Sequence, residues 1–158
     1  MSLDPDIICL GKALANGHAI GAILGREPLR EAAARILYTS TYIFSAVCMT
    51  AAIATLDVYA RDDGFGRIIR AGERLRDGVL AAAARHGASL GFSGPVSHPM
   101  VVFENDGDGK RNEHFAYKAA QRGLLFHPRL CWFLSAAHDD AAVDDAIAIA
   151  DAALAASA

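Results

Sequence analysis

The sequence predicts an α/β chain whose latter part forms an α+β unit. Short apolar segments rich in β-branched residues lie near its start, which is typical of strands. Apolar residues then recur at helical spacing over two long stretches, after which strand and helix signals alternate. Hydrophobic residues make up 53% of the 158 positions, and the mean hydropathy of +0.24 predicts a packed core rather than disorder.

Two strands and a short helix are predicted in the first part of the chain. Residues 5–10 are apolar and β-branched, so they predict a strand that ends at Gly11. Residues 17–25 are apolar and rich in glycine, which indicates a strand that a backbone or a ligand approaches closely. Pro28 is placed to begin a short helix, and residues 38–44 are expected to be extended or a loop.

Two long helices are predicted next. Ser45 is in a position to cap the first, whose apolar residues recur at helical spacing: Met49, Ile53 and Leu56. The second runs from about residue 67, with apolar residues on one face and arginines on the other, and stops at Gly87.

The rest of the chain predicts an α+β unit of roughly three strands and three helices. Residues 100–103, 124–126 and 132–134 are expected to be strands. A helix capped by Asn112 lies between the first two, and the last helix is capped by the pair Asp139 and Asp140.

Charge and cysteine content narrow the function classes. A net charge of -3 argues against nucleic acid or an anionic membrane as an electrostatic partner. No apolar run approaches the roughly 18–20 residues that span a bilayer. Cys9, Cys48 and Cys131 are an odd number outside any metal-ligand spacing, so we expect reduced thiols in a cytoplasmic protein. The first three residues run almost at once into an apolar strand, so we expect a piece of a longer protein.

Lys12 is the first candidate for chemistry. It follows an apolar strand and has Gly11 and apolar residues as neighbours. A lysine that loses hydration in such a place has a less favoured charged form and a more nucleophilic amine, as Schiff-base formation with an aldehyde requires. The residues alone fit a solvated surface lysine at a strand end as well.

Two other motifs do not support a phosphate or metal site. Asp6 and Ala13 occupy the positions where a P-loop needs glycine and Ser or Thr. Residues 106–109, reading DGDG, lack the later acidic ligand of a calcium loop and predict a plain turn.

The segment around Lys12 carries a family resemblance. Residues 5–26, reading PDIICLGKALANGHAIGAILGR, resemble the lysine signature of class III pyridoxal-phosphate-dependent aminotransferases. In that signature an apolar strand leads into Gly-Lys, a turn of small residues and a Gly-Ala strand. The resemblance implies that Lys12 forms a Schiff base with pyridoxal 5'-phosphate.

A second segment extends the resemblance. Residues 40–56, reading STYIFSAVCMTAAIATL, resemble the family's threonine loop and the alanine-rich helix after it. The resemblance implies that Thr41, with Ser40 beside it, contacts the phosphate of the cofactor in the neighbouring subunit of a homodimer. On the residues alone, these hydroxyls fit a turn. Many family members have Ser-Gly-x-Pro after the threonine, whereas this chain has residues 43–46 reading IFSA, which leaves the substrate open.

A third segment matches the closing part of the family. Residues 122–147 resemble the final strand pair and helix of members similar to glutamate-1-semialdehyde aminomutase. The resemblance places His127, Arg129 and Trp132 at the border of the substrate entrance. Arg129 is a candidate to bind a substrate carboxylate in a bidentate fork, although a surface arginine after proline is common.

The resemblance implies the carboxy-terminal portion of a fold-type I transferase. Residues 1–60 would end the large cofactor-binding domain, and residues 61–158 would form the small α+β domain with a roughly three-stranded antiparallel sheet. The implied function is transfer or intramolecular migration of an amino group on a small amino or keto substrate. The family's pyridine-nitrogen acid, ring-stacking aromatic and glycine-rich phosphate turn have no counterpart here, so we expect the 158-residue chain to be inactive by itself.

Two other functions stay open at this point. One is a non-enzymatic interaction or dimerisation module that keeps the family's fold. The other is an enzyme that forms a Schiff base on Lys12 without pyridoxal phosphate. Transferases and mutases of the family use the same lysine, so the sequence does not tell amino-group transfer from intramolecular migration.

Overall fold

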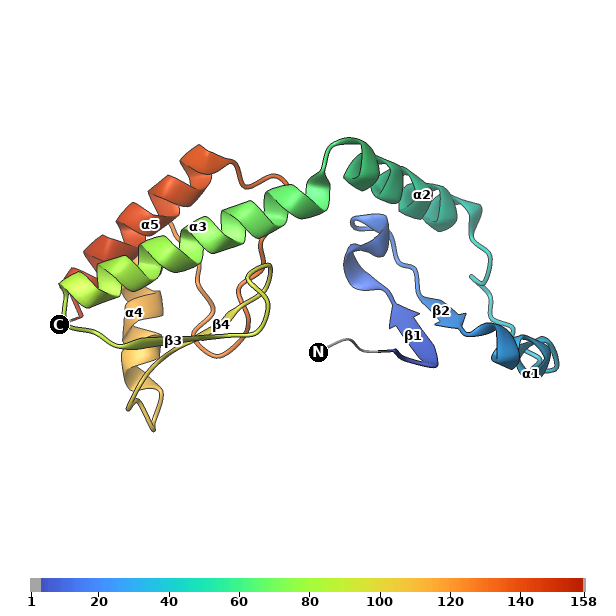
Figure 1. Ribbon diagram of the computed structural model, residues 1–158, viewed down its shortest axis with the longest axis horizontal. Helices are drawn as coiled ribbons and strands as arrows, with labels where there is room; N and C mark the ends of the chain where they lie inside the picture. Colours follow the sequence, from blue (N-terminus) through green and yellow to red (C-terminus); the bar gives the residue numbers. More distant parts are fainter. Residues whose placement is uncertain (1–3, 158) are drawn as a thin grey trace. The chain divides into compact units, whose positions relative to one another are not determined.

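The computed structural model describes residues 4–157, which divide into two compact units (Figure 1). The first unit ends at Asp62 and the second begins at Asp63. The boundary lies close to the expected one between residues 60 and 61. That residues 1–60 end a large domain and residues 61–158 form a small domain stays a prediction.

A strand hairpin opens the first unit. Strand β1 (Ile7–Leu10) pairs antiparallel with β2 (Ala22–Gly25), with Ile7 opposite Gly25 and Leu10 opposite Ala22. The second strand is shorter than the predicted 17–25 because the chain first turns, through a 3-10 helix η1 (Lys12–Ala15) and Gly17 at φ 104°. Both predicted strands are therefore present, and they pair with each other in one hairpin.

Helices complete the first unit. The 3-10 helix η2 (Glu27–Leu29) and helix α1 (Arg30–Ala34) follow the hairpin, and α2 (Ala46–Arg61) contacts η1. Ser45 stands at the N-cap of α2, but its side chain makes no capping hydrogen bond. Few side chains are buried in this unit. Large apolar residues are exposed on both strands, on the loop after α1 and on α2, with Leu37 at 92% and Tyr42 at 86%.

Three helices and one hairpin form the second unit. Helices α3 (Gly64–Arg85) and α5 (Asp140–Ala155) pack along each other, and α4 (Lys110–Ala120) packs against α5. Strands β3 (Leu90–Ser93) and β4 (Met100–Phe103) pair antiparallel. Strand β3 was not predicted.

The sheet of the second unit has two strands where roughly three were expected. Residues 124–126 and 132–134 do not form the strands predicted for them. Trp132 and Leu134 each donate a backbone N–H to the segment before β4, at the carbonyls of Pro99 and Ser97. Since Pro99 has no N–H, the reciprocal bond of an antiparallel pair cannot form there, and a third strand does not develop.

The core of the second unit is aliphatic on the helices and aromatic near the hairpin. Helices α3 and α5 meet through small and branched residues, of which Val79 is 0% and Leu154 2% exposed. Phe115 of α4 lies against the aromatic side chains of the loop after it. The mixture of helices with small antiparallel sheets agrees with the predicted fold class.

Candidate functional site

Lys12 lies in a tight turn directly after β1. Its backbone has φ 49°, a left-handed conformation that is uncommon outside glycine, and Asn16 repeats it at φ 44°. The turn is held by hydrogen bonds from the N–H of Leu14 to the carbonyl of Gly11, at 3.0 Å, and from Asn16 to Ala13, at 3.2 Å. Strained conformations of this kind cluster at functional sites.

Lys12 borders an open hollow lined mostly by small residues. The lining residues all come from the same turn: Lys12, Gly17, His18, Ala19, Ile20 and Gly21. No side chain crowds the glycines there, because a Cβ added at Gly17 would meet no atom within 4 Å and one at Gly21 only the Leu10 carbonyl at 3.9 Å. Lys12 forms no hydrogen bond or ion pair within residues 4–157. The turn thus offers a free amine beside room for a flat ligand.

The expected loss of hydration around Lys12 does not occur. Its side chain is exposed, although α2 contacts the 3-10 helix η1 that Lys12 begins. The Lys12 side chain is therefore open to solvent within the described residues. His18 lines the same hollow as Lys12.

Ser40 and Thr41 lie in the loop that leads into α2. The Ser40 carbonyl accepts the N–H of Ile43 at 3.2 Å, which closes a turn, and both side chains are exposed. Neither hydroxyl has a hydrogen-bond partner within the described residues. The hollow at Lys12 does not include them, so the first unit does not join these three residues into one pocket.

Arg129 belongs to a turn in the second unit, residues 127–129, which we call the Pro128 turn. Its guanidinium binds Glu113 of α4, with Nε at 3.0 Å and Nη2 at 2.5 Å from the same carboxylate oxygen. The Arg129 N–H donates to Nδ1 of His127 at 3.0 Å. The charge of Arg129 is thus already paired, although its side chain is 66% exposed. The sequence did not indicate Glu113 as its partner, because the two lie on different elements.

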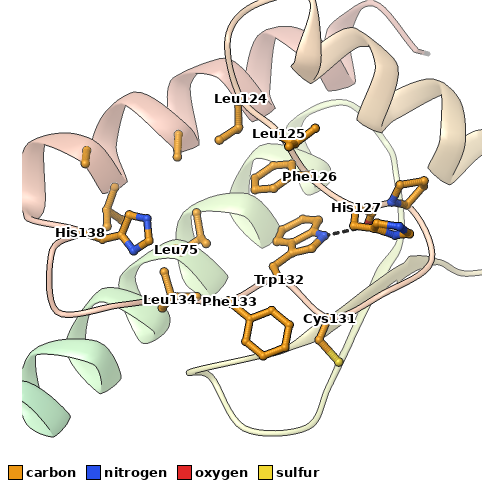
Figure 2. Close-up of a pocket in the computed structure, with 14 residues that line it drawn as sticks. Leu75, Leu124, Leu125, Phe126, His127, Cys131, Trp132, Phe133, Leu134 and His138 are labelled. Atoms are coloured by element: carbon orange, nitrogen blue, oxygen red, sulfur yellow. Dashed lines mark hydrogen bonds between the residues drawn. The ribbon is translucent and has the colours of Figure 1, made fainter. Parts of the chain in front are cut away.

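An apolar pocket lies behind the Pro128 turn in the second unit (Figure 2). The rings of Phe126 and Trp132 stack at 3.7 Å with planes 4° apart, and form one wall. Leu75 of α3 and Val143 of α5 also line the pocket. His138 lies at the end away from His127 (Figure 2). The lining is mostly aliphatic and aromatic, with His127, His138 and Cys131 as its polar side chains. His127 and Trp132, which the family resemblance placed at the border of the substrate entrance, both line this pocket.

Within residues 4–157, no group of His, Cys, Asp and Glu side chains is placed to hold a metal ion. The turn at residues 106–109 instead serves α4, because Asp106 accepts the N–H groups of Arg111 and Asn112. None of the described helices is long and apolar enough to cross a lipid bilayer.

Comparison with known proteins places these features in context. The family model described as "Aminotransferase class-III" matches residues 1–153. The chain is 39% identical over 145 residues to an aminopentol aminotransferase of Sphingopyxis macrogoltabida, which covers 92% of this chain and 34% of that relative. It is 32% identical over 111 residues to a glutamate-1-semialdehyde 2,1-aminomutase of Halobacterium salinarum, covering 68% and 25% of the two chains.

Solved structures agree on the fold. The internal aldimine form of the Sphingopyxis sp. MTA144 FumI protein, which contains PLP, matches with a TM-score of 0.93 and 37% identity. That match covers 98% of this chain and 37% of the other. A transaminase with PLP bound matches with a TM-score of 0.86 at 19% identity, over 98% of this chain and 39% of that one. The present chain spans about a third of the length of the curated relatives first matched.

Proposed function

This chain belongs to the class-III aminotransferase family, and from that premise we propose that it supplies the cofactor lysine of an enzyme that transfers or migrates an amino group. Membership confirms the resemblance seen in the sequence. The relatives named above are aminotransferases and aminomutases, which supports an enzymatic role. The cofactor is pyridoxal 5'-phosphate, and the substrate is a small amino or keto compound.

Lys12 is the residue on which the proposal rests. The observation that carries it is an amine without a partner in the described residues, at the edge of a glycine-lined hollow directly after a strand. Its Nζ would hold the cofactor covalently until an amino substrate takes its place. When bound, the cofactor supplies an electron sink for charge that develops on the substrate carbon. The freed Lys12 amine then removes the proton from the substrate carbon next to the nitrogen, as a general base.

Ser40 and Thr41 are proposed to contact the phosphate of the cofactor in the partner subunit of a homodimer. Their hydroxyls are exposed and free to donate, which suits a phosphate. Their absence from the hollow at Lys12 supports a role at another copy's site. Each subunit would then complete the site of the other.

Arg129 is proposed to bind the carboxylate of a substrate. A guanidinium can donate hydrogen bonds to two carboxylates at different edges, and here one edge donates to Glu113. The exposed remainder of the side chain is the part available to a substrate.

The 158 residues are proposed to be inactive by themselves. Lys12 is exposed, and apolar side chains of β1, β2 and α2 are uncovered, among them Ile23 at 73% and Ile53 at 61%. A site in this state does not exclude water or desolvate its amine. Activity is therefore expected only in a longer protein that contains this chain. The free thiols of the described cysteines are consistent with a cytoplasmic location, which we also propose.

The test is turnover of an amino donor in such a longer protein, with pyridoxal 5'-phosphate added. We expect turnover in the wild type and its loss, together with the lysine-dependent absorption band, in Lys12→Ala. Lys118→Ala changes another lysine, on α4, and should behave as the wild type. Absence of any lysine-dependent band in the wild type would favour a non-enzymatic module. A substrate adduct on Lys12 without cofactor would favour a Schiff-base enzyme of another kind.

A further inference from the structure

Asn112 is a buried polar side chain of the second unit, on the first turn of α4. It is 5% exposed, whereas the other core residues there are apolar or aromatic. Its side-chain amide donates to the carbonyl of Val101 in β4, at 3.3 Å, and to the carbonyl of Pro128. Its backbone N–H donates to Asp106 at 2.9 Å, which fixes the start of the helix. A buried amide with both donor hydrogens used is costly to disturb.

The preceding carbonyl of the same turn, that of His127, also accepts a hydrogen bond from a buried side chain. Nε1 of Trp132 donates to the carbonyl of His127 at 3.1 Å, the bond drawn as a dashed line in Figure 2. Trp132 is itself 6% exposed and stacked on Phe126. Two consecutive carbonyls of the Pro128 turn therefore bind two side chains that are fixed in the core.

The side chain of Arg129 binds the same turn of α4. Glu113, which pairs with its guanidinium, is the residue next to Asn112. The first turn of α4 thus holds both the backbone of the Pro128 turn and the arginine that the turn presents. A change at Asn112 would move the backbone that carries Arg129 without removing any group that could touch a substrate.

We infer that Asn112 is a positioning residue, which fixes the Pro128 turn so that Arg129 meets the carboxylate of a substrate. The inference rests on the proposed role of Arg129. Asn112 then acts in substrate recognition indirectly. Its side-chain amide holds the backbone of the Pro128 turn, and Arg129 makes the contact with the substrate. Trp132 supports the same turn from the other side.

The hydrogen bonds can be tested on the wild-type chain alone. We expect the side-chain amide protons of Asn112 to exchange with solvent far more slowly than those of the exposed Asn105. Equal exchange rates at the two positions would overturn the inference. This measurement needs no variant and is independent of any enzymatic activity.

The effect on the turn is tested by tryptic cleavage after Arg129. Asn112→Asp keeps the size of the side chain but removes both donors, and Asn105→Asp makes the same change on the surface. We expect cleavage after Arg129 to be about tenfold faster in Asn112→Asp and unchanged in Asn105→Asp. If Asn112→Asp is cut throughout the second unit, Trp132→Phe replaces it, because this change removes the Nε1–H bond to His127 and leaves a smaller aromatic ring against Phe126. Unchanged cleavage in the folded variant would contradict the inference.

The recognition role is tested in a longer active protein, with alanine as a carboxylate-bearing donor and 1-phenylethylamine as a donor without one. Asn112→Asp should raise KM for alanine by about tenfold, with kcat and the KM for 1-phenylethylamine nearly unchanged. Equal losses with both donors would show a merely structural role and overturn the inference. A failure of the proposed function has a different sign: Lys12→Ala would then leave turnover intact, whatever the effect of Asn112→Asp.

Discussion

Gly72 of α3 lies directly against the backbone of Val96, in the loop between β3 and β4. A Cβ added at Gly72 would fall well inside van der Waals contact with the Val96 carbonyl oxygen and carbon. Because of this close approach, the loop between β3 and β4 packs directly on helix α3. The segment after it, residues 97–99, receives the N–H groups of Trp132 and Leu134, so the contact also supports the loop that carries Arg129.

Replacing Gly72 by alanine should destabilise the second unit. Gly78→Ala is a control further along the same helix, where the added Cβ would meet side-chain atoms of Ile147 rather than backbone. Both variants gain the same helix propensity, so their difference reports the contact. We expect Gly72→Ala to lower the free energy of unfolding by about 2 kcal/mol more than Gly78→Ala. Trp132, the single tryptophan, lies in this unit and reports urea unfolding by fluorescence. Equal stability of the two variants would show that the Val96 segment shifts freely.

Asp139 should stabilise α5 as its N-cap. Its side chain accepts the N–H of Ala142 at 2.9 Å, as the sequence predicted. Asp139→Ala is expected to cost about 1 kcal/mol of unfolding free energy. Asp145→Ala, an exposed acidic residue in the interior of the same helix, should cost much less. The measurement is the shift of the urea midpoint for each variant, and a similar shift in both would indicate that charge, rather than capping, matters.

Asp151 should make stability depend on pH in the acid range. The hydrogen bond from His86, with Nε2 at 2.8 Å, and then Arg85 hold the pKa of the Asp151 carboxyl below its usual range. Because the folded form binds the proton less readily than the unfolded form, this contribution is present above the unfolded pKa of about 3.9 and is lost as pH falls through the folded pKa. Asp151→Asn should therefore be less stable than the wild type at pH 7, with the difference closing below about pH 4. Urea midpoints at a series of pH values check this, and a difference that does not shrink as pH falls below about 4 would contradict it.

Much of the fold followed from local patterns. The helices α2 and α3 were predicted because apolar spacing and a terminal Gly87 are local signals, and the cap at Asp139 because its chemistry is local too. The strands predicted at residues 124–126 and 132–134 were wrong. The aromatic residues that suggested strands, Phe126 and Trp132, are instead buried in the core. Because Pro99 has no N–H, residues 132–134 cannot form a full antiparallel ladder with the segment before β4.

The candidate site was predictable only in part. Lys12 stood out because a strand, a glycine and a turn are adjacent in sequence. The bonds of Glu113 and Asn112 to the Pro128 turn were not predicted, since they join residues about 16 positions apart whose proximity depends on tertiary packing. Desolvation of Lys12 was expected and does not occur, because burial depends on surrounding elements rather than on the local sequence.

The central claim is that Lys12 holds the cofactor. The most direct measurement is borohydride reduction of a longer protein that contains this chain, loaded with pyridoxal 5'-phosphate, followed by peptide mass spectrometry. The chain has three lysines, so Lys110 and Lys118 serve as internal controls. We predict a single cofactor adduct on the peptide containing Lys12, and none in Lys12→Ala. A stable adduct on another lysine, with Lys12 unmodified, would contradict the account.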